Sequence, residues 1–96
     1  MTTDLKEQFA KAAEALKAAG AREVYLFGSA ATGHLREDSD IDIAVSGLPP
    51  RQFFRAMGQV SRILRRPVDL IDLDEDNPFT EYLKKEGHLV HVEAVA

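Results

Sequence analysis

Three aspartates and a Gly-Ser pair are the residues of this chain whose types and spacing could do chemistry. Asp40 and Asp42 alternate with apolar residues in the segment SDIDIAV, residues 39–45. Residues i and i+2 of a β-strand project to the same face, about 6.5 Å apart. Two carboxylates held in this way suit a hard divalent cation such as Mg²⁺, which prefers carboxylate oxygens and keeps positions open for phosphate oxygens. The spacing therefore predicts a metal site on a strand.

A third carboxylate and a turn of small residues complete this candidate site. Two metal ions about 3.5–4 Å apart usually need a further carboxylate, and Asp69 in the segment VDLID is the most plausible source. Gly28 ends an apolar segment and lets the backbone approach a phosphate closely, while Ser29 offers an N–H and a hydroxyl. These residues together predict a site for a metal-bound nucleotide.

Other interpretations of the same segments are excluded or stay open. GSAATG lacks the Lys-Ser/Thr that completes a Walker A loop, and it does not match GxGxxG. The aspartates at 38, 40 and 42 imitate the start of an EF-hand, but Ile43 and Pro49 stand where glycine and glutamate are required. The open alternative is that Asp40 and Asp42 lie on the solvent face of an edge strand. We expect His34 to be an ordinary loop residue, with phosphate contact as the alternative.

The elements that must position these residues follow from hydrophobic periodicity, glycines and prolines. We expect helices over 3–19, from 50 or 51 to 65, and over 79–86, and strands over 23–27, 41–45, 68–73 and 89–95, with a turn or one helical turn at 29–33. Asp40 leads into the second strand, and the acidic residues at 72, 74 and 76 are expected in a solvated loop. The inward face of the second long helix is predicted to carry Phe53, Phe54, Met57, Val60, Ile63 and Leu64. This order predicts an α+β fold, a mixed sheet with helices packed against it.

Length and charge limit the function classes. The 96 residues, with a formal net charge of -4 and no cysteine, predict one domain over 1–96 and exclude a thiolate metal site. An acidic chain does not offer the broad basic surface of a nucleic-acid binder, and we expect the arginines between 51 and 66 to lie on the solvated face of a helix. No apolar run approaches bilayer length, so we expect a cytoplasmic protein without a membrane segment.

The segments LFGSAATG, DSDIDIAV and PVDLIDLD, in this order, resemble the minimal nucleotidyltransferases of the DNA-polymerase-beta-like superfamily. The resemblance implies the polymerase-beta-like fold and transfer of a nucleoside monophosphate, AMP from ATP, to an acceptor hydroxyl. It implies that Asp40 and Asp42 hold two Mg²⁺ ions, and that Asp69 ligates the catalytic ion and helps deprotonate the acceptor. Gly28 and Ser29 would hold the departing pyrophosphate.

The same resemblance implies a partner and contains one departure. Minimal members often act as the antitoxin of a helical HEPN-type toxin, which they adenylylate. A binding module that neutralises its partner by contact, and a homo-oligomer that modifies a small molecule, are the alternatives. The family's turn usually reads Gly-Ser-Arg-Ala-Arg-Gly, whereas Ala30 and Thr32 stand here in place of the arginines. Their loss predicts weaker stabilisation of charge on the triphosphate.

Overall fold

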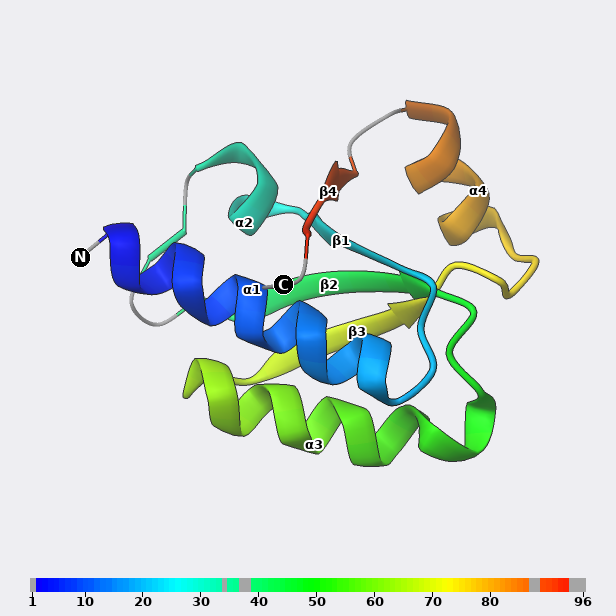
Figure 1. Cartoon of the computed structure of the whole chain (residues 1–96). Helices are drawn as coiled ribbons and strands as arrows, with labels where there is room; N and C mark the ends of the chain where they lie inside the picture. The colour runs from blue at the N-terminus through cyan, green and yellow to red at the C-terminus, as the bar shows by residue number, and fades with distance from the viewer. Residues whose placement is uncertain (1, 34, 37–38, 87–88, 94–96) are drawn as a thin grey trace.

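Within the described residues, four strands form one mixed sheet in the order β3-β2-β1-β4. The computed structural model describes residues 2–33, 35–36, 39–86 and 89–93. The elements in chain order (Figure 1) are α1 (Thr2–Ala18), β1 (Glu23–Phe27), α2 (Ser29–Thr32), β2 (Ile41–Ser46), the 3-10 helix η1 (Pro50–Gln52), α3 (Phe53–Leu64), β3 (Val68–Asp72), α4 (Pro78–Glu86) and β4 (Val90–His91). The predicted α+β class with a mixed sheet is confirmed.

The pairing of the strands explains how distant segments meet. β1 pairs antiparallel with both β2 and β4, and β2 pairs parallel with β3. A parallel neighbour requires a crossover connection, which α3 supplies between β2 and β3. The residues that enter β2 therefore lie beside the residues that enter β3, although α3 separates them in the sequence.

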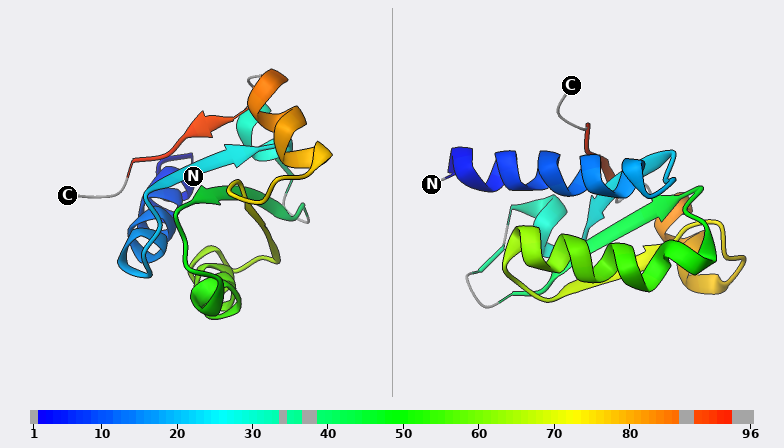
Figure 2. Two further views of the ribbon diagram at one scale, coloured as in Figure 1. Left: turned by 90° about the vertical axis from the view of Figure 1, so that its right-hand side faces the viewer. Right: turned by 60° about the horizontal axis from the view of Figure 1, so that its bottom comes forward.

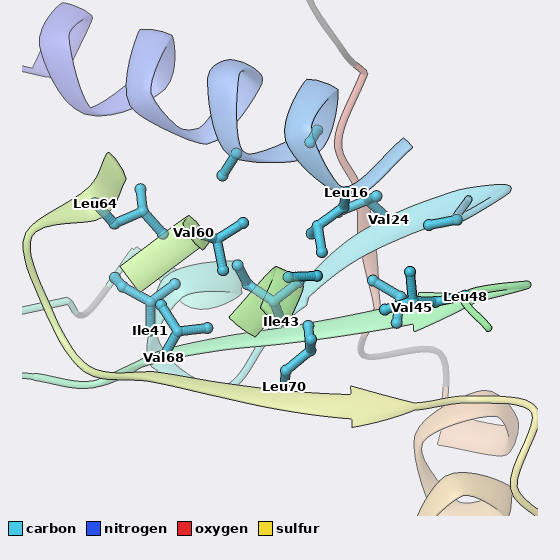
Figure 3. Packing of buried hydrophobic residues seen from close by; sticks show 14 of the residues in the cluster. Leu16, Val24, Ile41, Ile43, Val45, Leu48, Val60, Leu64, Val68 and Leu70 are labelled. Atoms are coloured by element: carbon cyan, nitrogen blue, oxygen red, sulfur yellow. The ribbon is translucent and has the colours of Figure 1, made fainter. Parts of the chain in front are cut away.

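Two helices cover one face of the sheet. α1 and α3 lie side by side on that face, as Figures 1 and 2 show. Alternate residues of the strands point toward these helices and make the main core, in which Ile41, Ile43 and Val60 are almost completely buried. Figure 3 shows these side chains between the helices and the sheet. Burial of apolar area on this one face supplies the main stabilisation of the domain.

The opposite face of the sheet is covered only in part, by α4. A second apolar cluster joins Phe27, Ala44, Leu73 and Leu83, and the ring of Phe27 meets that of Phe79 edge to face at 6.0 Å. Asp42 and Asp69 belong to this face because they alternate with the core residues of β2 and β3. We call it the open face.

Several details differ from the sequence prediction. α1 spans Thr2–Ala18 rather than 3–19, and a 3-10 turn precedes α3. Phe54 is 79% exposed, so its predicted inward position is wrong. The buried residues Ala56, Val60 and Leu64 repeat every four positions and fix the inward face, and Phe54 does not fall in that series. β4 is limited to Val90–His91, and the predicted end of this strand, 94–95, lies outside the described residues.

Candidate active site

Asp42 and Asp69 are neighbours across the parallel pair of strands β2 and β3. Their Cα atoms are register partners, so both side chains lie on the open face at the same level of the sheet. On the other side of Asp42, its antiparallel partner is Phe27, the last residue of β1. The row Asp69, Asp42, Phe27 thus places two carboxylates beside a buried aromatic ring.

Asp40 stands immediately before β2 rather than within it. Its side chain is exposed, as is that of Asp69, whereas Asp42 is partly buried. Partial burial, and then the charges of Asp69 and Asp40, raise the pKa of the Asp42 carboxyl above its ordinary value. The three carboxylates therefore act on one another electrostatically at one end of the open face.

Gly28 is shaped to accommodate Asp42. Its backbone has φ 64° and ψ -143°, a combination that residues with a Cβ atom rarely adopt. A Cβ at this position would collide with Oδ2 of Asp42 and would lie 3.3 Å from its Cγ. The turn thus brings the backbone directly against the central carboxylate.

Ser29 begins the short helix α2, for which Gly28 is the N-cap residue. Ser29 is partly buried, and the carbonyl oxygen of Gly28 accepts hydrogen bonds from the N–H groups of Ala31 (3.1 Å) and Thr32 (3.2 Å). The first N–H groups of a helix have no acceptor within it, so Ser29 and Ala30 present donors where the turn meets the site. The structure places Gly28 against Asp42, with Ser29 next in the chain, and the binding of a nucleotide by these two residues stays a prediction.

A hydrogen-bonded loop positions Asp40, and its components were missed at the sequence level. Oγ of Ser39 accepts a hydrogen bond from the N–H of Arg36 at 3.0 Å, and the N–H of Ser39 donates to the carbonyl of Arg36 at 3.1 Å. Nη1 of Arg66 donates to that same carbonyl at 2.5 Å. Arg66 therefore ties the segment before Asp40 to the end of α3. Nothing in the sequence pattern distinguishes Arg66 from the neighbouring surface arginines.

The other polar residues considered from the sequence have structural roles or lie outside the described residues. Asp72 ends β3, and its Oδ1 accepts a hydrogen bond from the N–H of Asp74 at 2.9 Å. Oδ2 of Asp74 accepts one from the N–H of Gly47 at 2.6 Å. His34 lies outside the described residues. Nε2 of His91, in β4, lies 2.7 Å from Oε2 of Glu23.

The carboxylates of Asp40, Asp42 and Asp69 are the type of ligand that a hard divalent cation prefers, although these side chains are not arranged around one point. Carboxylate oxygens on the open face and the bare backbone of Gly28 are what a metal-bound phosphate requires. Among the described residues, no three Asp, Glu, His or Cys side chains stand close enough together to hold a metal ion. Binding by all three aspartates thus requires at least one of them to change rotamer. The exposed side chains of Asp40 and Asp69 have room to do so.

Comparisons with known proteins agree with this fold. The family model described as "Polymerase beta, Nucleotidyltransferase" matches residues 10–94. One chain of a toxin-antitoxin crystal structure with AMP-PNP is similar, with a TM-score of 0.69 and 24% identity, over 85% of this chain and 69% of that one. A chain from a mutant MntA-HpeT toxin-antitoxin complex, with two aspartates replaced by glutamate, gives 0.66 and 22% over the same shares. No curated protein sequence matches significantly.

Within the part of the chain that the structure describes, no helix combines the length and apolar character needed to span a membrane.

The two solved structures share the fold of this chain, and the family model covers most of its length. The resemblance seen in the sequence is thereby confirmed: this chain belongs to the polymerase-beta nucleotidyltransferase family and is a nucleotidyltransferase.

Proposed function

We propose that this cytoplasmic enzyme transfers AMP from ATP to a hydroxyl group of a partner protein, with Mg²⁺, and acts as the antitoxin of a HEPN-type toxin. The observation that carries the transfer reaction is the row of Asp42 and Asp69 on the open face, with Gly28 against Asp42. Carboxylates from two neighbouring strands, next to a turn without side-chain bulk, give a nucleoside triphosphate both metal ligands and backbone donors.

In this proposal the three aspartates hold the metal ions and Asp69 has a second role. Asp40 and Asp42 would ligate two Mg²⁺ ions, and Asp69 would complete the set. Bound Mg²⁺ would supply charge stabilisation at the attacking and leaving oxygens. The exposed carboxylate of Asp69 is also accessible to an incoming acceptor, from whose hydroxyl it can accept the proton.

The reaction exchanges one P–O bond for another. The acceptor oxygen forms a bond to the α-phosphorus, the bond from that phosphorus to the bridging oxygen breaks, and pyrophosphate leaves with the bonding electrons. The acceptor proton passes to Asp69. In this proposal the N–H of Ser29 and its hydroxyl would donate hydrogen bonds to the departing pyrophosphate, which is supported by the turn of the chain at Gly28.

The toxin partner is supported by the two structures of similar fold. Both belong to toxin-antitoxin complexes, and one contains AMP-PNP, an analogue of ATP. In the other, two aspartates were the residues chosen for substitution by glutamate. This chain has paired aspartates at Asp40 and Asp42, which would occupy the corresponding role if it acts on a toxin in the same manner.

The test is transfer of label from α-³²P-ATP to the protein that copurifies with this chain, with and without Mg²⁺. We expect label on the partner with the wild-type protein and at least about a hundredfold less with Asp42→Asn, because the substitution removes a central ligand. Asp76→Asn, which removes a carboxylate from the exposed loop after β3, is the matched control and should retain activity. Labelling that is equal in all three proteins would refute the assignment of the site.

One observation favours a second candidate function, neutralisation of a partner by contact. The helix α2 carries Ala30 and Thr32 where related turns carry arginine, and it has no basic residue in its last turn. Fewer cations beside the triphosphate reduce the stabilisation of its charge. If Asp42→Asn still inhibits the toxin while transferring no label, contact rather than adenylylation protects the cell.

A further inference from the structure

A groove runs along the free edge of the sheet at β3. Residues 70–72 form its floor, Phe53 and Phe54 line it from the α3 side, and Phe79 lines it from the α4 side. Its volume is about 610 Å³. Phe54 is 79% exposed and Phe79 is 47% exposed, so large apolar side chains border a strand edge that pairs with no other described segment. Such an edge is a template for pairing with another strand.

The backbone of β3 has its unused hydrogen-bonding groups on this edge. The carbonyl of Pro67 accepts from the N–H of Ile41 at 3.0 Å, and the N–H of Leu73 donates to the carbonyl of Val45 at 2.7 Å. Because the groups alternate along a strand, those of the odd-numbered residues face β2 and those of the even-numbered residues face outward. The N–H and C=O of Leu70 therefore point out from the middle of the edge.

The charges on either side of β3 have opposite signs. Arg65 is exposed and Arg66 partly buried immediately before the strand, whereas Asp74, Glu75 and Asp76 are exposed immediately after it. Two copies of this segment that run antiparallel bring the basic end of each against the acidic end of the other. A parallel arrangement would place like charges together. The charge pattern therefore selects an antiparallel second copy as the occupant of the groove.

We propose that the chain forms a two-fold symmetric dimer in which β3 pairs antiparallel with β3 of a second copy. With Leu70 on the axis, the two Leu70 residues exchange both N–H···O bonds, and each Asp72 N–H donates to the Val68 carbonyl of the other copy. Each Arg65 then faces the Glu75 of the other copy. A contact that uses the same patch on both copies is closed, so pairing ends at the dimer.

The dimer also affects the candidate active site, although the proposal does not depend on the transfer reaction. In this register Asp69 of one copy lies beside Ile71 of the second copy on the open face. The second copy thus borders the edge of the site nearest to Asp69. β4 lies at the other edge of the sheet and therefore takes no part in this contact.

The experiment is sedimentation equilibrium of the full chain and of three charge variants. We expect the wild type to have a mass of twice the 10.6 kDa of one chain. The affinity of dimerisation should be lower in high salt, because salt screens the ion pairs. Arg65→Glu and Glu75→Arg should each weaken dimerisation by about tenfold or more, because each turns two ion pairs into two repulsions. The double variant Arg65→Glu/Glu75→Arg should recover it. A mixture of the two single variants should form a heterodimer, because both contacts are then complementary.

The mixing experiment distinguishes loss of the ion pairs from loss of the fold, because a variant that has unfolded would not form a dimer with the other variant. Lys17→Glu, on the exposed side of α1, makes the same charge change away from the groove and should leave the dimer unchanged. A wild-type chain that stays monomeric, or a dimer indifferent to the reversals, would overturn the proposal. The proposal would also be overturned if the chain is a monomer and Glu75→Arg abolishes the binding of a different protein. That result would assign the groove to that protein.

Discussion

Replacement of Gly28 by alanine should be costly because it strains the backbone and displaces Asp42 at once. The backbone of Gly28 lies in a region close to one used almost only by glycine, where another residue costs about 1–3 kcal/mol. The new Cβ would also collide with Oδ2 of Asp42. The Asp42 side chain would then have to leave its preferred rotamer, which costs about 0.5–1.5 kcal/mol. We expect a total destabilisation of roughly 2–4 kcal/mol, a large share of the ~5–15 kcal/mol of a small domain.

Gly33 provides the matched control for this substitution. It also has a positive φ, 79°, but a Cβ there would meet nothing within 4 Å. Gly33→Ala should therefore carry only the backbone cost, about 1–2 kcal/mol. Urea denaturation followed by circular dichroism gives both free energies of unfolding, and the melting temperature should fall by roughly 4–8 °C for each kcal/mol.

A double-mutant cycle with Asp42→Ala isolates the collision. That substitution removes the Oδ2 and Cγ atoms and leaves the Cβ of residue 42, which is at an ordinary 3.7 Å from the new methyl group. Gly28→Ala should cost about 1 kcal/mol less in the Asp42→Ala background than in the wild type. The reasoning fails if the cost is the same in both backgrounds, or if Gly28→Ala is no more destabilising than Gly33→Ala.

The remaining predictions concern charge and a buried hydroxyl. The folded state raises the pKa of the Asp42 carboxyl above its ordinary value of 3.8, which means that the folded chain binds this proton more tightly than the unfolded chain does. The stability that this carboxyl contributes is therefore complete below pH 3.8 and is lost as the pH rises through the raised pKa. Asp42→Asn should therefore be more stable than the wild type at pH 7 in EDTA but not at pH 3.5, by urea denaturation, and an equal difference at both pH values would contradict this. Thr80, 2% exposed, donates from Oγ1 to the Glu75 carbonyl at 2.6 Å, so Thr80→Val should cost about 1–3 kcal/mol in the same assay and Thr80→Ser much less. Thr32→Arg should raise the rate of label transfer by about tenfold by adding a cation to α2, whereas Thr32→Gln should not.

Local pattern was sufficient to predict the elements and the strand positions of the site. Period-two alternation placed Asp42 on the face opposite the core, Asp69 was identified as the candidate third carboxylate in the segment VDLID, and Gly28 was identified from its position at the end of an apolar strand. Their contact was harder to foresee, because it depends on which strands are neighbours and in what register. Asp40 immediately precedes β2, as predicted, whereas the hydrogen bond from the N–H of Arg36 to Oγ of Ser39, the residue before Asp40, was not foreseen.

Features that arise from tertiary contacts could not be predicted from the sequence. The exposure of Phe54 depends on which face of α3 meets the sheet, and apolar character alone gave the wrong answer. The bond from Arg66 to the carbonyl of Arg36 joins segments far apart in the chain, and no local preference signals it. Phe27 was predicted only as the last residue of a strand, and its position as the neighbour of Asp42 follows from the antiparallel register.

The parallel pairing of β2 with β3 has a consequence for how the protein gains activity during folding. Asp42 and Asp69 come together only when the whole crossover through α3 has closed, a contact between segments distant in sequence. A hairpin of β1 and β2 can form early and already holds Gly28 against Asp42, but it lacks the third carboxylate. If Asp69 completes the site as proposed, partly folded chains, including those still on the ribosome before β3 has emerged, should be inert toward ATP. Catalytic competence should appear in the same kinetic phase as protection of the β3 amides from hydrogen exchange.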